Sequence, residues 1–247
     1  MIILIAPEID IKNEIQILHQ LFDAGLEFYH FRKPSKNLEK HRDYLNKIDE
    51  KHHDKIITHY FHELANEYNL KGIHLQEQAR IDFGNDLGSY VSAYREQSEL
   101  RQSLSQKRSE SSSETVKLSN QKSSVAKIAG SISSSFHDPT TLENCSTNFD
   151  YHFLSPVFSS ISKKGYKGKG FDVNGINKTI VGMGGVNEDT IEATLKLGYK
   201  GIGVLGSVWN EKNPLNAFLN IKKKYDEIKS LNHSNTYALQ HINFNNS

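Results

Sequence analysis

The chain has 247 residues, enough for one large domain or two small ones with a full hydrophobic core. Its formal net charge of +1 gives no overall field that would attract nucleic acid or an acidic membrane surface. No apolar run has the length of a membrane span, and the run at residues 2–5 is too short for a signal peptide. The single cysteine, Cys145, excludes an intrachain disulfide and a cysteine-based zinc site. We therefore expect a cytoplasmic protein.

Short apolar segments that are typical of buried strands alternate along the chain with segments of helical spacing. After the first strand, for example, Ile11, Ile15, Leu18 and Phe22 recur every three or four residues, as on one face of a helix. The expected strands are residues 2–5, 26–31, 55–59, 72–75, 127–133, 150–158, 179–183 and 201–205. This alternation favours a parallel sheet, and eight units favour a closed (β/α)8 TIM barrel over the alternative, an open doubly wound sheet.

Two segments do not follow the barrel pattern. Residues 98–124 hold ten serines, no aromatic residue and few aliphatic ones, so they cannot bury enough surface to offset the cost of ordering. We expect a disordered insertion there, between the fourth and fifth units, at the end of a helix near residues 87–94. The last part of the chain is polar and rich in Asn and His, which predicts a flexible tail over residues 231–247. The barrel itself is expected within residues 1–230.

The segment after the sixth strand has the composition of an anion-binding loop. An apolar run ending at Phe158 is followed by serines within residues 159–162, four lysines within residues 163–169, and three glycines. Hydroxyls and backbone N–H groups donate to anionic oxygens, lysines neutralise them, and glycines let the backbone approach. In a barrel this loop lies beside the turns after strands seven and eight, here Gly184-Gly185 and Leu205-Gly206, where phosphate sites are common. A solvated basic loop is the alternative interpretation.

With these motifs the chain resembles the thiamine phosphate synthase and thiazole tautomerase (TenI) family. The resemblance covers nearly the whole barrel, apart from the insertion and the tail. Its motifs, in chain order, are His30-Phe31-Arg32-Lys33-Pro34, His74-Leu75, Ser135-Phe136-His137, Ser155-Pro156-Val157-Phe158 followed by Ser160, Ser162 and Lys163, Gly184-Gly185-Val186, and Leu205-Gly206. Each motif is weak alone, but their order and their positions at strand ends make the signal specific.

The resemblance implies an enzyme of thiamine biosynthesis, which couples an aminopyrimidine diphosphate to a thiazole phosphate and releases pyrophosphate. The residues that would hold the thiazole phosphate are Ser160, Ile161, Ser162, Gly185, Leu205 and Gly206. Arg32, Ser135 and Lys163 would hold the diphosphate, and catalysis would come chiefly from stabilising negative charge on the leaving group. The other substrate-binding positions expected at the strand ends are His30, Lys33, His59 and His74. A chain of this size could form a homodimer or stay a monomer.

The family also uses a magnesium ion held by two aspartates, and here the sequence departs from it. The first aspartate position carries Tyr60, and the second falls on Ala79, with Glu77 and Asp82 nearby but out of register. Magnesium prefers carboxylate and water oxygens, which tyrosine and alanine do not supply. The strand-two motif also ends in Pro34, where the family has lysine. The donor set therefore argues against the magnesium that the resemblance implies.

Two other functions stay open. A thiazole tautomerase moves a proton on a carboxythiazole phosphate without a metal, and His137 suits that role because the unperturbed pKa of histidine lies near neutrality. A structural role for His137, as a cap of the next helix, is the simpler interpretation. The second function is a barrel that binds the thiazole phosphate without catalysis. His30, His59 and His74 are expected to share one mouth, either as polar lining of a phosphate pocket or as a transition-metal site.

Overall fold

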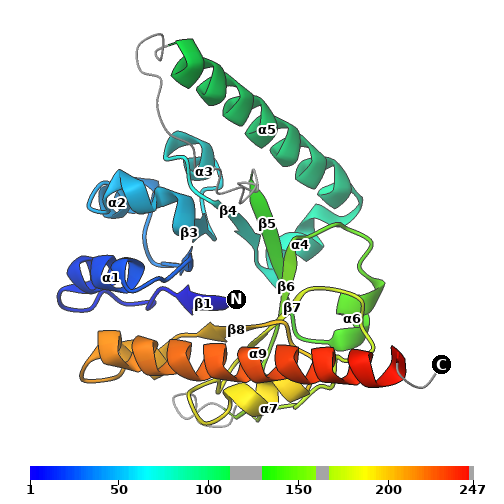
Figure 1. Ribbon diagram of the computed structural model, residues 1–247. Helices are drawn as coiled ribbons and strands as arrows, with labels where there is room; N and C mark the ends of the chain where they lie inside the picture. Colours follow the sequence, from blue (N-terminus) through cyan, green and yellow to red (C-terminus); the bar gives the residue numbers. More distant parts are fainter. Residues whose placement is uncertain (112–129, 160–166, 245–247) are drawn as a thin grey trace.

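Strand β1 pairs with both β2 and β8, so the sheet closes on itself as a barrel in the order β1 to β8 (Figure 1). The computed structural model describes residues 1–111, 130–159 and 167–244. Its strands are β1 (Ile2–Ile5), β2 (Phe28–Phe31), β3 (Ile56–Thr58), β4 (Gly72–Leu75), β5 (Ser131–Phe136), β6 (Tyr151–Leu154), β7 (Ile180–Met183) and β8 (Gly201–Val204). Every neighbouring pair is parallel, which confirms the predicted (β/α)8 TIM barrel.

Helices surround the barrel and several begin at residues that the sequence marks as caps. They are α1 (Glu14–Asp23), α2 (Leu38–Leu45), α3 (Leu64–Glu67), α4 (Glu77–Phe83), α5 (Leu87–Ser111), α6 (Pro139–Asn144), α7 (Ile191–Lys196), α8 (Gly206–Trp209) and α9 (Pro214–Phe244), with short 3-10 helices η1 (Glu50–Lys55) and η2 (Gly84–Asp86). The side chain of Asn37 accepts from the Lys40 N–H at 3.0 Å before α2. Asp138 accepts from the Thr141 N–H at 2.7 Å, and Pro139 opens α6.

The core has two parts, as a barrel requires. The larger cluster fills the layer between the strands and the helices, where Leu18, Phe22 and Phe218 are buried. The smaller one lies inside the barrel and consists of Ile3, Ile5, Ile57, Tyr151, Phe153 and Val181. Apolar side chains occupy only part of the interior, because β2 to β5 also point polar groups inward; these form the floor of the site described below.

Strand β5 begins at Ser131 and continues past the predicted end at residue 133 to Phe136; of the residues predicted for it, 127–129 lie outside the described part of the chain. The strand is built mainly from serines whose hydroxyls are satisfied. Ser134 Oγ donates to the Leu75 carbonyl at 2.8 Å, and Ser133 Oγ lies 2.8 Å from His74 Nδ1. Ser135 and Phe136 therefore belong to the strand, with His137 directly after it.

Helix α5 is longer than expected, because residues 98–111 of the segment predicted to be disordered are helical. Its first turns are held by the buried side chains of Leu87, Val91 and Tyr94, and extending an anchored helix costs little per residue. The remainder of the predicted insertion, residues 112–124, lies outside the described part of the chain.

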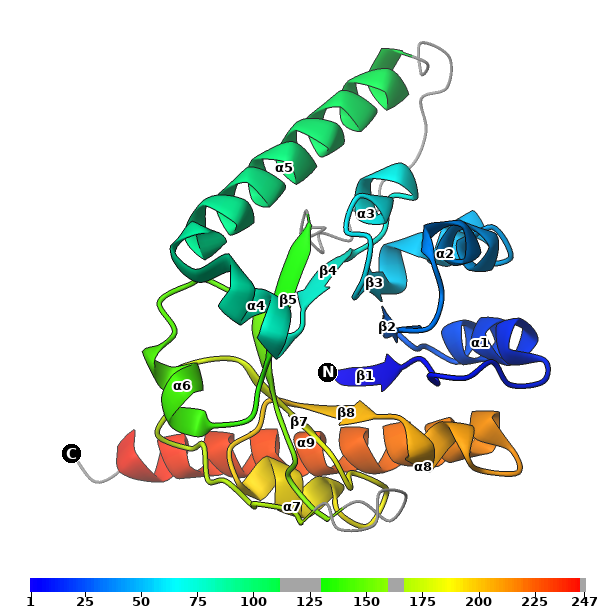
Figure 2. The ribbon, with the colours of Figure 1, turned by 180° about the vertical axis from the view of Figure 1, so that it is seen from behind.

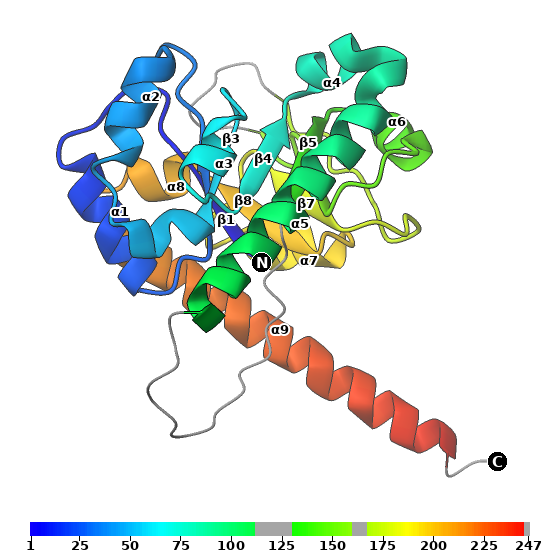
Figure 3. The ribbon, with the colours of Figure 1, turned by 90° about the horizontal axis from the view of Figure 1, so that it is seen from above.

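Helix α9 also departs from prediction, since it runs through residues 231–244, where we expected a flexible tail. It packs against α1, α7 and α8 near its start and projects beyond the barrel at its end (Figure 3). Continuation of a helix that is already nucleated and packed explains the difference. Within the described residues, no helix combines the length and the apolar character that crossing a bilayer requires.

Candidate functional site

A cavity of about 1360 Å³ opens at the carboxyl ends of the strands. In a TIM barrel this end carries the active site, because the βα loops converge there. Eight of the residues predicted for the site line the cavity: Arg32, His59, His74, Ser135, His137, Gly185, Leu205 and Gly206. A second hollow of 590 Å³ lies between α1 and α2, away from the strand ends, and none of the predicted site residues lines it.

The glycine turn after β7 forms one wall of this cavity. Gly184 and Gly185 have positive φ values of 97° and 67°, which L side chains rarely adopt. A Cβ on Gly185 would come within 2.7 Å of the Ser159 carbonyl oxygen, so a side chain cannot be added without displacing the neighbouring loop. The turn after β8 lies beside it, because Ser207 Oγ donates to the Val186 carbonyl at 3.0 Å. Two turns predicted to bind phosphate therefore share one wall.

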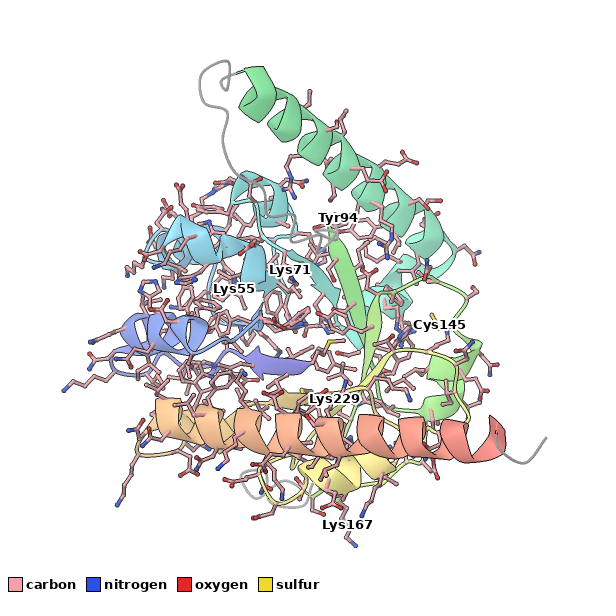
Figure 4. The ribbon with its side chains drawn as sticks, in the orientation of Figure 1. Lys55, Lys71, Tyr94, Cys145, Lys167 and Lys229 are labelled. Atoms are coloured by element: carbon pink, nitrogen blue, oxygen red, sulfur yellow. The ribbon has the colours of Figure 1, made fainter. Side chains whose placement is uncertain are left out.

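The loop after β6 is attached to the same wall at both of its described ends. The Phe158 N–H donates to the Gly184 carbonyl at 2.9 Å, and the Gly170 N–H donates to the Val157 carbonyl at 2.9 Å. Lys169 extends its ammonium group to the His137 carbonyl, 3.3 Å away, whereas Lys167 points away from the body of the molecule (Figure 4). The predicted ligands Ser160, Ile161, Ser162 and Lys163 lie outside the described residues.

The opposite side of the mouth carries Arg32. Its guanidinium forms an ion pair with Glu8 from the loop after β1, and both side chains remain partly exposed to the cavity. Glu8 was not foreseen from the sequence, and only its position just after the first strand could have indicated it. Arg32 is the cationic side chain best placed to meet an anion on this wall.

Lys33 does not belong to the mouth, although the strand-two motif predicted it as a substrate ligand. Successive residues of a strand point to opposite faces, so Lys33 turns outward when Arg32 faces the cavity. Its fully buried Nζ lies 2.8 Å from Glu14 Oε2 and 3.1 Å from Asp10 Oδ1. Tyr44 donates to the other oxygen of Glu14 at 2.6 Å. Lys33 therefore fastens β2 to α1 and contacts no part of the cavity.

His137 is held in a defined orientation at the edge of the cavity. Helices α4 and α6 pack beside β5 and bring Glu77 toward it (Figure 2). His137 Nδ1 lies 3.0 Å from the carbonyl oxygen of Ser155. Nδ1 also lies 3.1 Å from the Ser155 hydroxyl, which can donate or accept. Since the carbonyl can only accept, its contact favours the neutral tautomer with the proton on Nδ1 and a lone pair on Nε2. Nε2 faces Glu77 Oε2 at 3.8 Å, so a proton acceptor and a carboxylate meet at the mouth.

Beneath the mouth, three imidazoles form the floor of the cavity. His30 is completely buried and lies below the cavity wall, whereas His59 and His74 reach it. Burial lowers the pKa of His30 to about 3 and holds the pKa values of His59 and His74 well below the ordinary range. All three rings are therefore neutral at physiological pH.

The rings are connected to hydroxyl groups of neighbouring strands. His30 Nδ1 lies 2.8 Å from His59 Nε2, and His30 Nε2 lies 2.6 Å from the Tyr151 hydroxyl. His74 is held between Ser133 and Ser135, at 2.8 Å and 2.7 Å. Tyr151 was missed by the sequence analysis. The alternation of Tyr151, His152 and Phe153 could have indicated it, because it directs the first and third side chains to the same face.

The two positions that the resemblance gives to the magnesium ligands carry no carboxylate. Tyr60 places its hydroxyl 3.4 Å from Gln76 Oε1, and Ala79 has no donor atom. Other carboxylates line the cavity: Glu8 is paired with Arg32, Glu77 is paired with Arg80 and lies 3.8 Å from His137, and Glu188, Asp189 and Glu211 also reach the lining. Within the described residues, the one group of three or more metal-binding side chains is His30, His59 and His74, which are nitrogen donors, whereas magnesium prefers oxygen.

No protein-family model matches the chain, and no curated protein matches its sequence. Several solved structures, however, are similar to the chain. Thiamine phosphate pyrophosphorylase from Bacteroides thetaiotaomicron is similar over 92% of this chain and 97% of its own, with 24% identity and a TM-score of 0.60. Thiamine phosphate pyrophosphorylase from Pyrococcus furiosus is similar over 92% and 95%, with 14% identity and a TM-score of 0.61.

A third similar structure binds a different phosphorylated compound. (S)-3-O-geranylgeranylglyceryl phosphate synthase from Thermoplasma acidophilum, in complex with its substrate sn-glycerol-1-phosphate, covers 92% of this chain and 92% of its own, with 13% identity and a TM-score of 0.54. At these identities the likeness establishes architecture and leaves the reaction open. The chain has the barrel fold of the thiamine phosphate pyrophosphorylases, in agreement with the resemblance indicated by its motifs.

Proposed function

We propose that the protein is an enzyme of thiamine assembly that joins an aminopyrimidine diphosphate to a thiazole phosphate. The observation that supports this proposal is that Gly185, Gly206, Arg32 and Ser135 all line one cavity of about 1360 Å³. In the proposal, the glycine turns at Gly185 and Gly206 hold the thiazole phosphate, and Arg32 and Ser135 hold the diphosphate. A cavity of this size with a guanidinium and two glycine turns in its lining suits a reaction between two phosphorylated partners.

In this reaction the bond between the pyrimidine methylene carbon and the diphosphate oxygen breaks, and the diphosphate leaves with the electron pair. The thiazole nitrogen then donates its lone pair to the methylene carbon. Arg32 would stabilise the charge that accumulates on the leaving oxygens, and the backbone N–H groups of the glycine turns would orient the thiazole phosphate. We assign no step to magnesium, because the two positions that the resemblance gives to its aspartate ligands carry Tyr60 and Ala79.

A second candidate, tautomerisation of a carboxythiazole phosphate, is favoured by one specific observation. His137 donates through Nδ1 to the Ser155 carbonyl and leaves Nε2 as a proton acceptor that faces the cavity. In this reaction Nε2 would take a proton from one ring position and return it to another, so that no group is lost or gained. Glu77, 3.8 Å away, would stabilise the imidazolium formed between the two steps.

An assay with both purified substrates, with and without added Mg²⁺, separates the candidates. The synthase proposal expects pyrophosphate and thiamine phosphate to appear together in equal amounts. Isomerisation of the carboxythiazole phosphate alone, without release of pyrophosphate, would replace that proposal by the tautomerase. Binding of thiazole phosphate without either reaction would leave a non-catalytic binding protein, and no binding of either compound would refute the thiamine assignment.

A further inference from the structure

The floor of the barrel brings together three histidine side chains that the proposed reaction does not use. One ring nitrogen from each of His30, His59 and His74 lies within 4.8 Å of one from both others. His30 lies in β2, His74 in β4 and His59 directly after β3, where its N–H donates to the Phe31 carbonyl at 3.2 Å, so backbone hydrogen bonds fix the positions from which the rings project. The exposed fractions of the three side chains are 0%, 8% and 1%. Convergence of this kind on rigid elements is what a metal centre requires.

The hydrogen bonds on the far side of two rings resemble those of metal-bound histidines. Tyr151 contacts Nε2 of His30 and Ser133 contacts Nδ1 of His74. In metal sites, the second nitrogen of a histidine ligand is typically held in this way by an outer group that fixes the tautomer and the ring orientation. The ligand atoms would then be Nδ1 of His30, which now contacts His59, and Nε2 of His74, which now contacts Ser135.

His59 has one ring nitrogen in the cluster and one without a partner. Its Nε2 meets His30 Nδ1 at 2.8 Å, whereas its Nδ1 is buried and has no hydrogen-bond partner among the described residues. Buried histidine nitrogens without a partner also occur away from the cluster, for example in His52 and His152, so this atom does not by itself indicate an ion. His59 matters because, with His74, it joins the cluster to the lining of the open cavity.

We propose that His30, His59 and His74 bind a divalent transition-metal ion, with Zn²⁺ as the best fit, and leave one coordination position open to the cavity. Imidazole nitrogens suit Zn²⁺, Co²⁺, Ni²⁺ and Cu²⁺, whereas Mg²⁺ and Ca²⁺ require oxygen ligands. Three histidines and an open position form a common pattern for catalytic zinc, where water or an anion completes the tetrahedron. This site goes beyond the proposed coupling reaction and does not depend on it.

Small movements would convert the present arrangement into a coordination site. Tetrahedral zinc with bonds of about 2.0–2.1 Å to nitrogen places its ligand atoms about 3.3 Å apart. His30 Nδ1 and His59 Nε2 are 2.8 Å apart, so they would separate slightly as their shared proton is released. His74 would turn toward them and exchange its contact with Ser135 for the metal, while keeping its contact with Ser133.

The test measures zinc on the full chain, purified with an affinity tag that contains no histidine. After incubation with excess Zn²⁺ and gel filtration, we expect one bound zinc per chain by elemental analysis. His74→Gln and His59→Gln should lose that zinc. His152→Gln is the matched control, because this buried histidine contacts the Thr179 carbonyl on the outer side of β6 and lies outside the cluster. It should keep one zinc per chain.

Two further measurements protect the test from variants that fail to fold. Tyr151→Phe removes only the hydroxyl that holds His30 and should weaken zinc binding about 10- to 100-fold in competition with a chelating dye. In the Co²⁺ form, the intense visible bands of tetrahedral cobalt should appear and should shift when azide enters the open position. Absence of stoichiometric zinc in the wild-type chain, or equal zinc in all variants, would overturn the proposal and leave the cluster as a hydrogen-bonded network. Cobalt bands that do not respond to azide would overturn the open position.

Discussion

Nε2 of His137 and Oε2 of Glu77 face each other at 3.8 Å across the edge of the cavity, and they come from the loop after β5 and from the start of α4. The distance is too long for a hydrogen bond, so His137 Nε2 remains available to a bound ligand, while Glu77 is also paired with Arg80 at 3.5 Å. Two elements far apart in sequence thus place a proton acceptor beside a carboxylate. Substitution of His137 is therefore the most direct test of proton-transfer chemistry at the site.

If proton transfer is the reaction, His137→Ala should reduce turnover of the carboxythiazole phosphate by about 10²- to 10⁴-fold, because general acid–base catalysis contributes that much. The Kd of the phosphorylated ligand should stay nearly unchanged, since the glycine turns hold the phosphate. Single-turnover kinetics and calorimetric titration measure the two quantities. Turnover equal to that of the wild type would exclude His137 as the proton carrier.

Arg32 and Glu8 should have opposite effects on binding of inorganic pyrophosphate. Arg32→Gln removes a charge-assisted contact and should weaken binding by about 10- to 100-fold. Glu8→Gln removes the competing carboxylate and should strengthen binding a few-fold. Titration calorimetry gives both values, with Arg42→Gln as the control because Arg42 pairs with Glu67 on the outer surface. Equal affinities in all three variants would remove Arg32 from the anion site.

The turn after β7 should not accept any side chain at Gly185. Gly185→Ala would force a positive φ on alanine and a contact with the Ser159 carbonyl, which should cost about 1–3 kcal/mol of unfolding free energy. It should also weaken binding of thiazole phosphate by displacing the loop after β6. Gly175→Ala is the control, because nothing lies within 4 Å of its added Cβ. Matching urea unfolding curves for the two variants would contradict this account of the turn.

Lys33 should matter for stability and not for ligand binding. Lys33→Met leaves Glu14 buried without its cation and should lower the unfolding free energy by about 3–5 kcal/mol. Lys196→Met removes an exposed pair with Glu192 on α7 and should change it by less than about 1 kcal/mol. Denaturant unfolding compares them. A Lys33 variant that kept its stability but lost ligand affinity would restore the role predicted from the sequence.

His152 should make the fold less stable in mild acid. Burial is the main reason that its pKa falls from 6.5 to about 4, with Lys178 and Arg80 adding to the effect and Asp150 opposing it. As pH falls below 6.5 the unfolded chain takes up the proton first, so stability that is present above that pH is lost progressively toward pH 4. The slope should not exceed about 1.4 kcal/mol per pH unit. The unfolding free energies of the wild type and of His152→Gln, measured across this range, should converge as pH falls. A constant difference between them would contradict the role given to His152.

Seven of the eight strands could be predicted because each is a short, mainly apolar run bounded by turn residues, and period and spacing suffice to locate such runs; β5, built mainly from serines, is the exception. The positions of Gly185 and Gly206 at the mouth followed from the same reasoning, since they come directly after strands. The direction of side chains was harder to predict. Arg32 and Lys33 are adjacent in the sequence, yet Arg32 lines the cavity and Lys33 is buried outside it, and a motif match does not reveal which of the two faces the cavity.

The errors share a physical origin, which is that partners distant in sequence decide where polar residues lie. The serines of β5 form a strand because His74 and Leu75 satisfy their hydroxyls, and no local propensity shows this. Likewise, Lys33 is buried because Glu14 at the start of α1 and Asp10 in the loop before it meet its ammonium group. Residues 98–111 are helical because the packed start of α5 carries them. Sequence patterns indicate well which residues are buried, but they do not indicate which polar residues pair with one another.

The interlocked imidazoles and hydroxyls beneath the mouth also restrict how this barrel can change over evolutionary time. Replacing His30 alone by an aliphatic residue would remove the histidine partner of the Tyr151 hydroxyl. Replacing His74 alone would remove the histidine partner of two serine hydroxyls. Joint replacement of the whole group by well-packed apolar side chains avoids that penalty. Descendants of this sequence are therefore expected to keep the polar floor complete or to lose it all at once, with few viable intermediates.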